Sequence, residues 1–256
     1  MNWLLLRGLS REQRHWGAFG GVLAAALPEA RVHALDLAGT GTEHARPSPT
    51  TVEAIADDAR ARWLALRDAN PGPWGLFAMS LGGMVAMAWA SAHEADFARV
   101  VLVNTSAANL STPWRRLSLG VIPGIVRALV MRDPVRRERL VLSLVTRETP
   151  DLGRVAVEWA GYQRDRPVAR AAVLRQLWAG SRFSAPPRLS MPTLVLAGGR
   201  DPLTDPACPR RLAAHLGAPL EVHPTGGHEL ALDAPRWLAE RVAAWCASTP
   251  SPGGSP

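Results

Sequence analysis

The amino-acid sequence predicts an α/β fold in which a mostly parallel sheet of about six strands is flanked by helices. Six short apolar runs recur along the 256-residue chain, and most of them are separated by segments with helical periodicity. The runs are continuously apolar rather than alternating, which is typical of strands that are buried on both faces. Strands that alternate with helices favour a parallel, helix-covered sheet. The length suits one domain with a sizeable core and room for an insertion.

The expected strands are short and end at polar or turn-forming residues. They occupy 3–7, 31–36, 74–79, 99–104, 192–197 and 219–224. Helical patterns separate the earlier strands and stop at clear breakers. These patterns cover 15–27, which ends at Pro28, 51–69, which ends at Asn-Pro-Gly-Pro, and 82–93.

One interval, between Asn104 and Pro192, lacks the pattern of a central strand. It contains helical candidates punctuated by proline and glycine, at 114–119, 124–131, 135–146, 151–164 and 168–182. In the fourth candidate Val155, Trp159 and Tyr162 recur at the spacing of one helical face. We therefore expect an all-helical cap at 111–185, inserted into an α/β core formed by 1–110 and 186–248, and a disordered tail at 249–256.

The charge of the chain is concentrated in the predicted cap. Arginine supplies all 29 basic side chains, and the formal net charge is +7. Residues 111–185 contain 14 arginines and six acidic residues, so the remainder is close to neutral. No nucleic-acid motif accompanies this charge. Two interpretations stay open: coding bias with a solvated basic face, or a surface that recruits an anionic partner such as an acyl carrier protein or an anionic lipid surface. The candidate contact residues are Trp114, Arg136, Arg137 and Arg139.

The compartment is predicted from the start of the chain and from its apolar runs. The apolar run before Arg7 is short and has no basic residue ahead of it, unlike a signal peptide. No uncharged apolar run reaches the roughly 18 residues that a spanning helix needs. We therefore expect a cytoplasmic protein with free thiols at Cys208 and Cys246, and the arginine-, alanine- and proline-rich composition is typical of a GC-rich bacterial genome.

The stretch LFAMSLGGMVAMAW (76–89) places one hydroxyl, that of Ser80, in an apolar and glycine-rich run. The serine follows an expected strand and precedes an expected helix, the setting in which a sharp turn presents a nucleophile. Small residues are needed two positions before and after it, because the two arms of the turn nearly collide, and Ala78 and Gly82 stand there. The positive end of the helix and the amide of Leu81 face the same space. The alternative is an ordinary strand, turn and helix with an incidental serine.

A nucleophilic serine needs a histidine base and a carboxylate that orients it. His228 lies in a Gly-Gly loop just past the last expected strand, where the glycines let its imidazole swing over the edge of the sheet. His223 lies inside that strand, and structural or surface roles are favoured for it and for the remaining histidines. Asp201 follows the fifth strand, whereas Asp205 is expected to cap the next helix. The predicted triad is therefore Ser80, Asp201 and His228, each at the carboxyl end of a strand, where open α/β sheets build their sites.

Five motifs in this order resemble the α/β-hydrolase superfamily, in its helical-cap branch. They are RGLSREQRHW (7–16), ALDLAGTGTE (34–43), AMSLGG (78–83), GGRDPL (198–203) and GGHELALDAP (226–235). The resemblance implies an oxyanion hole formed by the backbone amides of Leu9 and Leu81. Arg7 stands where the family usually has histidine, and the first two strands common in the family are absent. In size, serine turn and cap the chain is similar to pimeloyl-[acyl-carrier-protein] methyl ester esterases.

These observations predict a serine hydrolase that cleaves carboxylic esters or thioesters through an acyl-enzyme. No cofactor is implied, and no metal cluster is evident in the sequence. Acyl transfer to another acceptor, peroxide-dependent oxidation and carbon–carbon hydrolysis use the same triad and stay open as alternatives. A catalytically silent scaffold used for binding is the alternative from another class.

Overall fold

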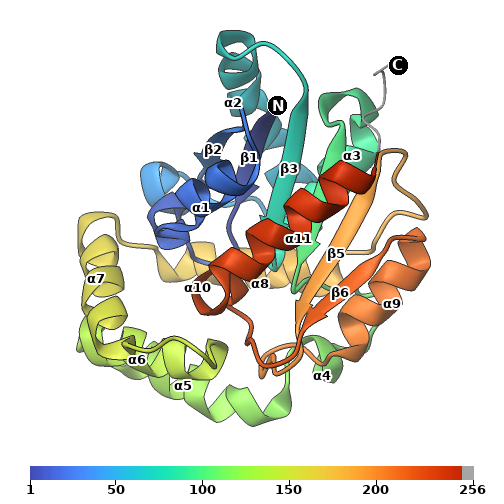
Figure 1. Cartoon of the computed structure of the whole chain (residues 1–256). Coiled ribbons are helices and arrows are strands. Elements are labelled where there is room, and N and C mark those ends of the chain that lie inside the picture. Colours follow the sequence, from blue (N-terminus) through green and yellow to red (C-terminus); the bar gives the residue numbers. More distant parts are fainter. Residues whose placement is uncertain (250–256) are drawn as a thin grey trace.

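The computed structural model describes residues 1–249 and contains one six-stranded sheet (Figure 1). The strand order is β2-β1-β3-β4-β5-β6, and all five pairings are parallel. The strands are β1 (Asn2–Leu6), β2 (Arg31–Leu35), β3 (Trp74–Met79), β4 (Arg99–Val103), β5 (Thr193–Gly198) and β6 (Leu220–His223). The predicted fold class is therefore confirmed, and each strand lies within two residues of its expected bounds.

The sheet is covered on both faces, which explains why its strands are continuously apolar. In β1, Leu4 and Leu6 belong to the core on one face, whereas Trp3 and Leu5 belong to the core on the other. Successive strand side chains point to opposite faces, so a strand with helices on both sides needs apolar residues at every position.

The helices divide between these two cores. One core takes in α2 (Val52–Ala69), α3 (Leu81–Ala92) and α9 (Ala207–Leu216), and the other takes in α1 (Phe19–Ala26), α10 (Leu230–Asp233) and α11 (Pro235–Ser248). The side chain of Thr51 accepts a hydrogen bond from the amide of Ala54 and caps the start of α2. Short 3₁₀ turns complete the connections: η1 (Gln13–Trp16), η2 (Gly41–Glu43), η3 (Glu94–Asp96) and η4 (Leu119–Val121).

The interval between β4 and β5 is helical. It contains α4 (Pro113–Arg116), α5 (Ile122–Val130), α6 (Pro134–Val145), α7 (Leu152–Asp165) and α8 (Arg170–Arg182). Helices α6 and α7 begin at Asp133 and Asp151, whose carboxylates accept hydrogen bonds from the first backbone amides. In Figure 1, α5, α6 and α7 lie together on the side of the molecule toward which the strands run. The carboxyl ends of the strands therefore face these helices.

Within the described residues, no helix is both long and apolar enough to cross a bilayer. The predicted tail at 249–256 falls outside the described part of the chain except for Thr249.

Candidate active site

Ser80 occupies the turn between β3 and α3 in a backbone conformation that is uncommon for a residue with a side chain. Its φ is 53° and its ψ is −120°. Such a conformation persists only where surrounding contacts hold it, and it is typical of functional turns. Here the Ser80 amide donates to the carbonyl of Val103 over 2.9 Å, and the Thr105 hydroxyl donates to the carbonyl of Ser80 over 2.7 Å. The neighbouring strand β4 thus fixes the turn.

Glycines let the end of β1 approach this turn closely. A Cβ on Gly82 would lie 2.5 Å from the carbonyl oxygen of Leu6 and 2.6 Å from that of Arg7. The crowding that demands a small residue at position 82 therefore comes from β1, not from the opposite arm of the turn as we expected. A Cβ on Gly8 would lie 3.1 Å from the Cβ of Ser80, so the segment after β1 passes directly against the serine.

Ser80, His228 and Asp201 are joined in a hydrogen-bonded relay. His228 Nε2 lies 3.0 Å from Ser80 Oγ, and His228 Nδ1 lies 2.7 Å from Asp201 Oδ2. Because a carboxylate only accepts, Nδ1 donates and Nε2 is left to accept the hydroxyl proton. The other oxygen of Asp201 accepts from the amides of Leu203 and Thr204 at 2.8 and 2.9 Å. The carboxylate is thereby held in one orientation toward the imidazole.

The environment of His228 strengthens its basicity. Burial alone would lower the pKa of this imidazole, but the charge of Asp201 and its hydrogen bond outweigh burial and raise the pKa above the usual value of 6.5. The side chain is almost entirely buried, as is that of Asp201. A buried histidine paired with a carboxylate can accept a proton more readily than a free one, as a general base requires.

Asn104, which follows β4, fixes the loop that carries His228. Its amide nitrogen donates to the carbonyls of Gly227 and His228 at 3.0 and 2.8 Å, and its oxygen accepts from the amide of Gly198 at 2.8 Å. From the sequence alone, Asn104 is recognised only as the last residue of an expected strand. The sequence signal for its role in holding the His228 loop is a polar side chain at the end of a central strand, beside the serine turn.

The glycines of the histidine loop serve close approach rather than mobility. A Cβ on Gly198 would overlap the carbonyl oxygens of Gly226 and Gly227, and one on Gly227 would lie 2.8 Å from the carbonyl oxygen of Val145 in α6. Neither Gly226 nor Gly227 has a positive φ. The expectation that these glycines let the imidazole swing over the sheet is therefore wrong, because the loop is packed against β5 and the cap.

The amides of Leu9 and Leu81 lie on the two segments that meet at Ser80. Leu81 is the first residue of α3, and Leu9 follows Gly8. Across residues 1–249, neither amide donates to an acceptor within the protein. An oxyanion hole needs amide donors of this kind, without an acceptor in the protein and on segments beside the nucleophile.

The segment after Leu9 contacts three of the helices between β4 and β5. The amide of Ser10 donates to Oε1 of the buried Gln176 in α8 over 3.0 Å, and Gln176 Nε2 donates to the carbonyl of Ala38 over 3.3 Å. Arg11 pairs with the buried Glu138 of α6 at 2.9 Å, and its guanidinium lies 4.5 Å from the ring centre of Trp159 in α7. Helices α6, α7 and α8 therefore hold the backbone that carries the candidate oxyanion donor.

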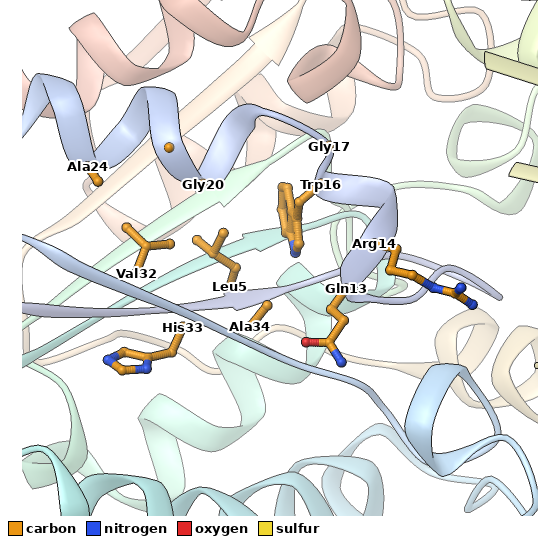
Figure 2. A pocket seen from close by; sticks show the side chains of 11 residues that line it. Leu5, Gln13, Arg14, Trp16, Gly17, Gly20, Ala24, Val32, His33 and Ala34 are labelled. Atoms are coloured by element: carbon orange, nitrogen blue, oxygen red, sulfur yellow. The ribbon is translucent and has the colours of Figure 1, made fainter. Parts of the chain in front are cut away.

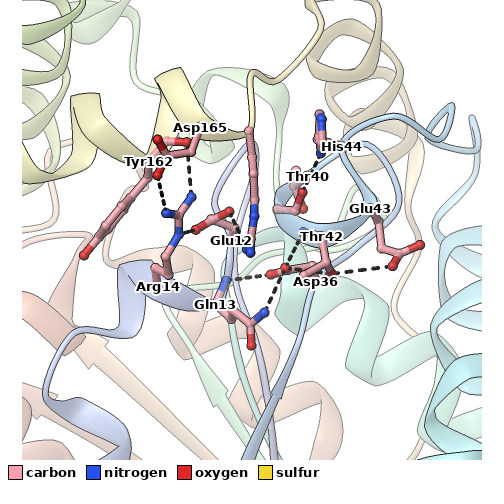
Figure 3. A network of polar contacts seen from close by, with 12 residues as sticks. Glu12, Gln13, Arg14, Asp36, Thr40, Thr42, Glu43, His44, Tyr162 and Asp165 are labelled. Carbon is pink, nitrogen blue, oxygen red and sulfur yellow. Dashed lines mark hydrogen bonds and ion pairs between the residues drawn. The ribbon is translucent and has the colours of Figure 1, made fainter.

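A polar network continues this junction outward (Figure 3). Arg14 donates to Asp165 and to the carbonyl of Tyr162 in α7, at 2.8 and 3.2 Å. Asp36 accepts from the amides of Gln13 and Thr42 at 2.6 and 2.8 Å and so ties the loop after β2 to the loop after β1. The loops after both strands are thus connected to α7.

Arg7 forms a buried ion pair with the residue that follows the candidate base. Its guanidinium lies 2.7 Å from Glu229 Oε2 and 4.7 Å from the ring centre of Trp16. Burial alone would raise the pKa of Glu229, but Arg7, with a contribution from Arg11, outweighs burial and lowers it. Arg7, which stands where the family usually has a histidine, therefore links the end of β1 to the loop that carries His228.

The remaining candidates lie on the outside of the cap. Trp114 is 60% exposed. Arg136 and Arg139 are exposed on α6, where Arg136 pairs with Asp133 at 3.5 Å, and Arg137 is partly buried. No contact in the described part of the chain joins any of these four candidates to Ser80, Asp201 or His228.

Two surface hollows lie elsewhere. One, of about 540 Å³, is lined by residues of β2, η1 and α1, among them Trp16, Val32 and His33 (Figure 2). Another, of about 300 Å³, lies between the start of α2 and the end of α8. Neither is lined by Ser80, Asp201 or His228. Over residues 1–249, no group of three or more His, Cys, Asp or Glu side chains is placed to hold a metal ion.

The parallel sheet, the serine turn and the helices between β4 and β5 define an α/β-hydrolase fold. The sequence model of one family, described as serine aminopeptidase, S33, matches residues 13–235. The chain therefore belongs to this family of α/β-hydrolases. A search of curated proteins finds no match to the sequence.

Solved structures share the fold across nearly the whole chain. A hydrolase of 2-hydroxy-6-oxo-6-phenylhexa-2,4-dienoate from Rhodococcus sp. strain RHA1 is similar at 20% identity with a TM-score of 0.76, covering 95% of this chain and 89% of the other. An enol-lactonase from Burkholderia xenovorans LB400 is similar at 21% identity with a TM-score of 0.72, covering 96% and 91%. A thermophilic esterase from Thermogutta terrifontis is similar at 23% identity with a TM-score of 0.70, covering 97% and 90%.

Proposed function

We propose that this hydrolase cleaves carboxylic esters or thioesters through an acyl-enzyme on Ser80. The observation that carries the proposal is the relay itself, with Ser80 Oγ 3.0 Å from His228 Nε2 and Asp201 Oδ2 2.7 Å from Nδ1. An esterase and an enol-lactonase are among the names of the similar structures, beside a hydrolase of 2-hydroxy-6-oxo-6-phenylhexa-2,4-dienoate. The relay supplies a nucleophile, a base and an orienting acid within hydrogen-bond distance.

In the proposed reaction Ser80 Oγ attacks the acyl carbon while His228 Nε2 takes its proton. The same proton then passes to the leaving alkoxide or thiolate, and the carbonyl is restored on the acyl-enzyme. Asp201 keeps the imidazole in the tautomer that accepts at Nε2 and stabilises the imidazolium. The amides of Leu9 and Leu81 stabilise the oxyanion, by roughly 3–4 kcal/mol each on the scale of single-donor losses. Water, deprotonated by His228, then attacks the acyl carbon; the bond to Ser80 Oγ breaks, the proton passes from His228 to that oxygen, and the acid is released.

The ion pair beside the base favours esters over the free amino termini that an aminopeptidase recognises. Recognition of a substrate ammonium needs an available carboxylate near the nucleophile. Glu229, the carboxylate adjacent to His228, is neutralised by Arg7 at 2.7 Å. The site therefore suits an uncharged acyl group better than a protonated amine.

The test compares p-nitrophenyl esters of short and medium acyl chains with the p-nitroanilides of alanine and leucine. We expect turnover of the esters, no measurable turnover of the anilides, and covalent labelling of Ser80 by a fluorophosphonate. Ser80→Ala should abolish turnover and labelling and leave the unfolding temperature within a few degrees, since the side chain removed is small. His228→Ala should cost a similar factor in kcat, because members of such a relay act as a unit.

Several outcomes would contradict the proposal. Labelling that persists in Ser80→Ala would place the nucleophile elsewhere, and faster anilide than ester cleavage would make the chain a peptidase. Acyl transfer to an added alcohol in preference to water, or cleavage of a carbon–carbon bond next to a carbonyl without ester turnover, would assign one of the alternative reactions. A folded protein with neither labelling nor turnover would point to a binding scaffold.

A further inference from the structure

Helix α5 of the cap presents a stripe of apolar side chains to solvent. Ile122, Val126, Leu129 and Val130 recur at the spacing of one helical face, and they are 36%, 55%, 52% and 75% exposed. Leu119, in η4 just before the helix, is 67% exposed. We call these five residues the α5 stripe. Scattered exposed apolar residues are ordinary, but a contiguous set on one helical face indicates an interaction surface.

The opposite face of α5 already has a partner, so the stripe is the outer side. Ala128 is buried. A Cβ on Gly124 would lie 2.7 Å from a methyl group of Leu144 in α6, which shows how closely the two helices pack. The stripe therefore does not complete the packing of the cap.

Unpaired arginines border the stripe. From Trp114 to Arg139 the chain carries seven arginines and two acidic residues. Both acids are occupied, Glu138 by Arg11 of the core and Asp133 by Arg136. Arg127 and Arg132 are exposed, and in residues 1–249 neither has a carboxylate within ion-pair distance. An apolar stripe with a cationic border needs a partner that is apolar inside and anionic at its surface.

An anionic lipid surface has this combination. Apolar side chains of an interfacial helix enter the boundary between headgroups and acyl chains, while arginines stay among the phosphates. A second copy of this chain fits poorly, since a symmetric contact through the stripe would bring Arg127 and Arg132 of both copies together.

We propose that the α5 stripe docks this protein on anionic lipid surfaces. The docked face belongs to the cap, so the carboxyl edge of the sheet and the candidate active site lie behind it. Binding through the stripe is independent of the proposed chemistry, because no residue of the stripe belongs to the relay.

The test is sedimentation of the full-length Ser80→Ala protein with vesicles, since this variant cannot consume the lipid. We expect binding to vesicles of phosphatidylglycerol and phosphatidylcholine in equal parts, and much weaker binding to phosphatidylcholine alone. Binding should fall steeply between about 0.1 M and about 1 M salt, where the screening length shrinks from ~10 to ~3 Å.

Two matched pairs of variants locate the surface. Val126→Glu should weaken vesicle binding at least tenfold, whereas Val157→Glu on α7 should not, although the two valines are 55% and 54% exposed. The double change Arg127→Gln/Arg132→Gln should weaken binding about thirtyfold, from about 1 kcal/mol for each basic residue at such a surface. Arg188→Gln/Arg210→Gln removes the same charge from exposed positions outside the cap and should change binding far less.

Equal losses in both members of either pair would overturn the proposal, as would equal binding to the two kinds of vesicle. A dimer in solution that Val126→Glu dissociates would assign the stripe to a second copy instead. Binding of an acidic acyl carrier protein that Val126→Glu abolishes, with vesicle binding unchanged, would assign it to a protein partner. Each variant's unfolding temperature checks that it is folded.

Discussion

Replacing Arg7 by methionine would leave a buried charge without its partner, and the cost can be worked out from the structure. The Arg7 and Glu229 side chains are 3% and 9% exposed, and the charged atoms lie 2.7 Å apart. Methionine removes the guanidinium and keeps an apolar side chain of similar length against Trp16. Breaking one partner of a buried pair typically costs about 3–5 kcal/mol, which for a domain of this size lowers Tm by roughly 10 °C.

The pH dependence of this loss has a definite sign. In the variant, burial is no longer outweighed by Arg7, so the pKa of folded Glu229 rises above its unfolded value of about 4.3. A raised folded pKa contributes stability below the unfolded pKa, and this stability is lost as pH rises through the folded pKa. The deficit relative to the parent protein should therefore be largest at neutral and alkaline pH and should shrink below about pH 5.

Urea unfolding at several pH values measures this difference, and two further variants serve as comparisons. Arg154→Met breaks the ion pair between Arg154 and Asp151, whose side chains are 75% and 60% exposed, respectively. This change should lower the free energy of unfolding by less than about 1 kcal/mol. The double change Arg7→Met/Glu229→Gln leaves no buried charge and should recover at least half of the loss. If Arg7→Met costs no more than Arg154→Met at pH 8, the ion pair does not have the role assigned to it here.

Three further predictions concern the proposed chemistry. Asp201→Asn should lower kcat by about 10⁴ through loss of the imidazole tautomer that accepts at Nε2. Asp205→Ala should instead cost about 1 kcal/mol of stability, because it removes the acceptor of the Ala207 amide at 2.7 Å. Steady-state kinetics and unfolding of both variants measure this difference, and the reverse pattern would move the acid. The value of kcat/KM should rise with pH through an apparent pKa above 6.5, because the raised pKa of His228 keeps its imidazole protonated to higher pH. A midpoint below 6.5 would contradict the pairing of His228 with Asp201. Gln176→Met should lower kcat about tenfold with little change in KM. The reason is that the hydrogen bond from the Ser10 amide to Gln176 holds the segment that carries one oxyanion donor. An increase in KM alone would make Gln176 a purely structural residue.

The sequence by itself determined the fold class and the order of the candidate triad. Strand and helix periodicities are local properties, so the buried runs were placed within two residues of β1 to β6. Ser80, Asp201 and His228 were found because each follows a strand, and parallel strands bring their carboxyl ends to one edge. The shared edge brings these side chains close together, and contacts such as those of Asn104 with the histidine loop set the distances of 3.0 and 2.7 Å.

Only the tertiary structure decided which polar residues support this site. Arg7 and Glu229 are 222 positions apart, Arg11 and Glu138 are 127 apart, and Ser10 and Gln176 are 166 apart. No local pattern relates such residues, because their pairing depends on how the segments after β1 and β6 and the helices between β4 and β5 pack together. The glycines of the histidine loop illustrate the same limit. The sequence shows only that a side chain is absent there. The fold shows the reason, which is that neighbouring backbone lies too close for a side chain.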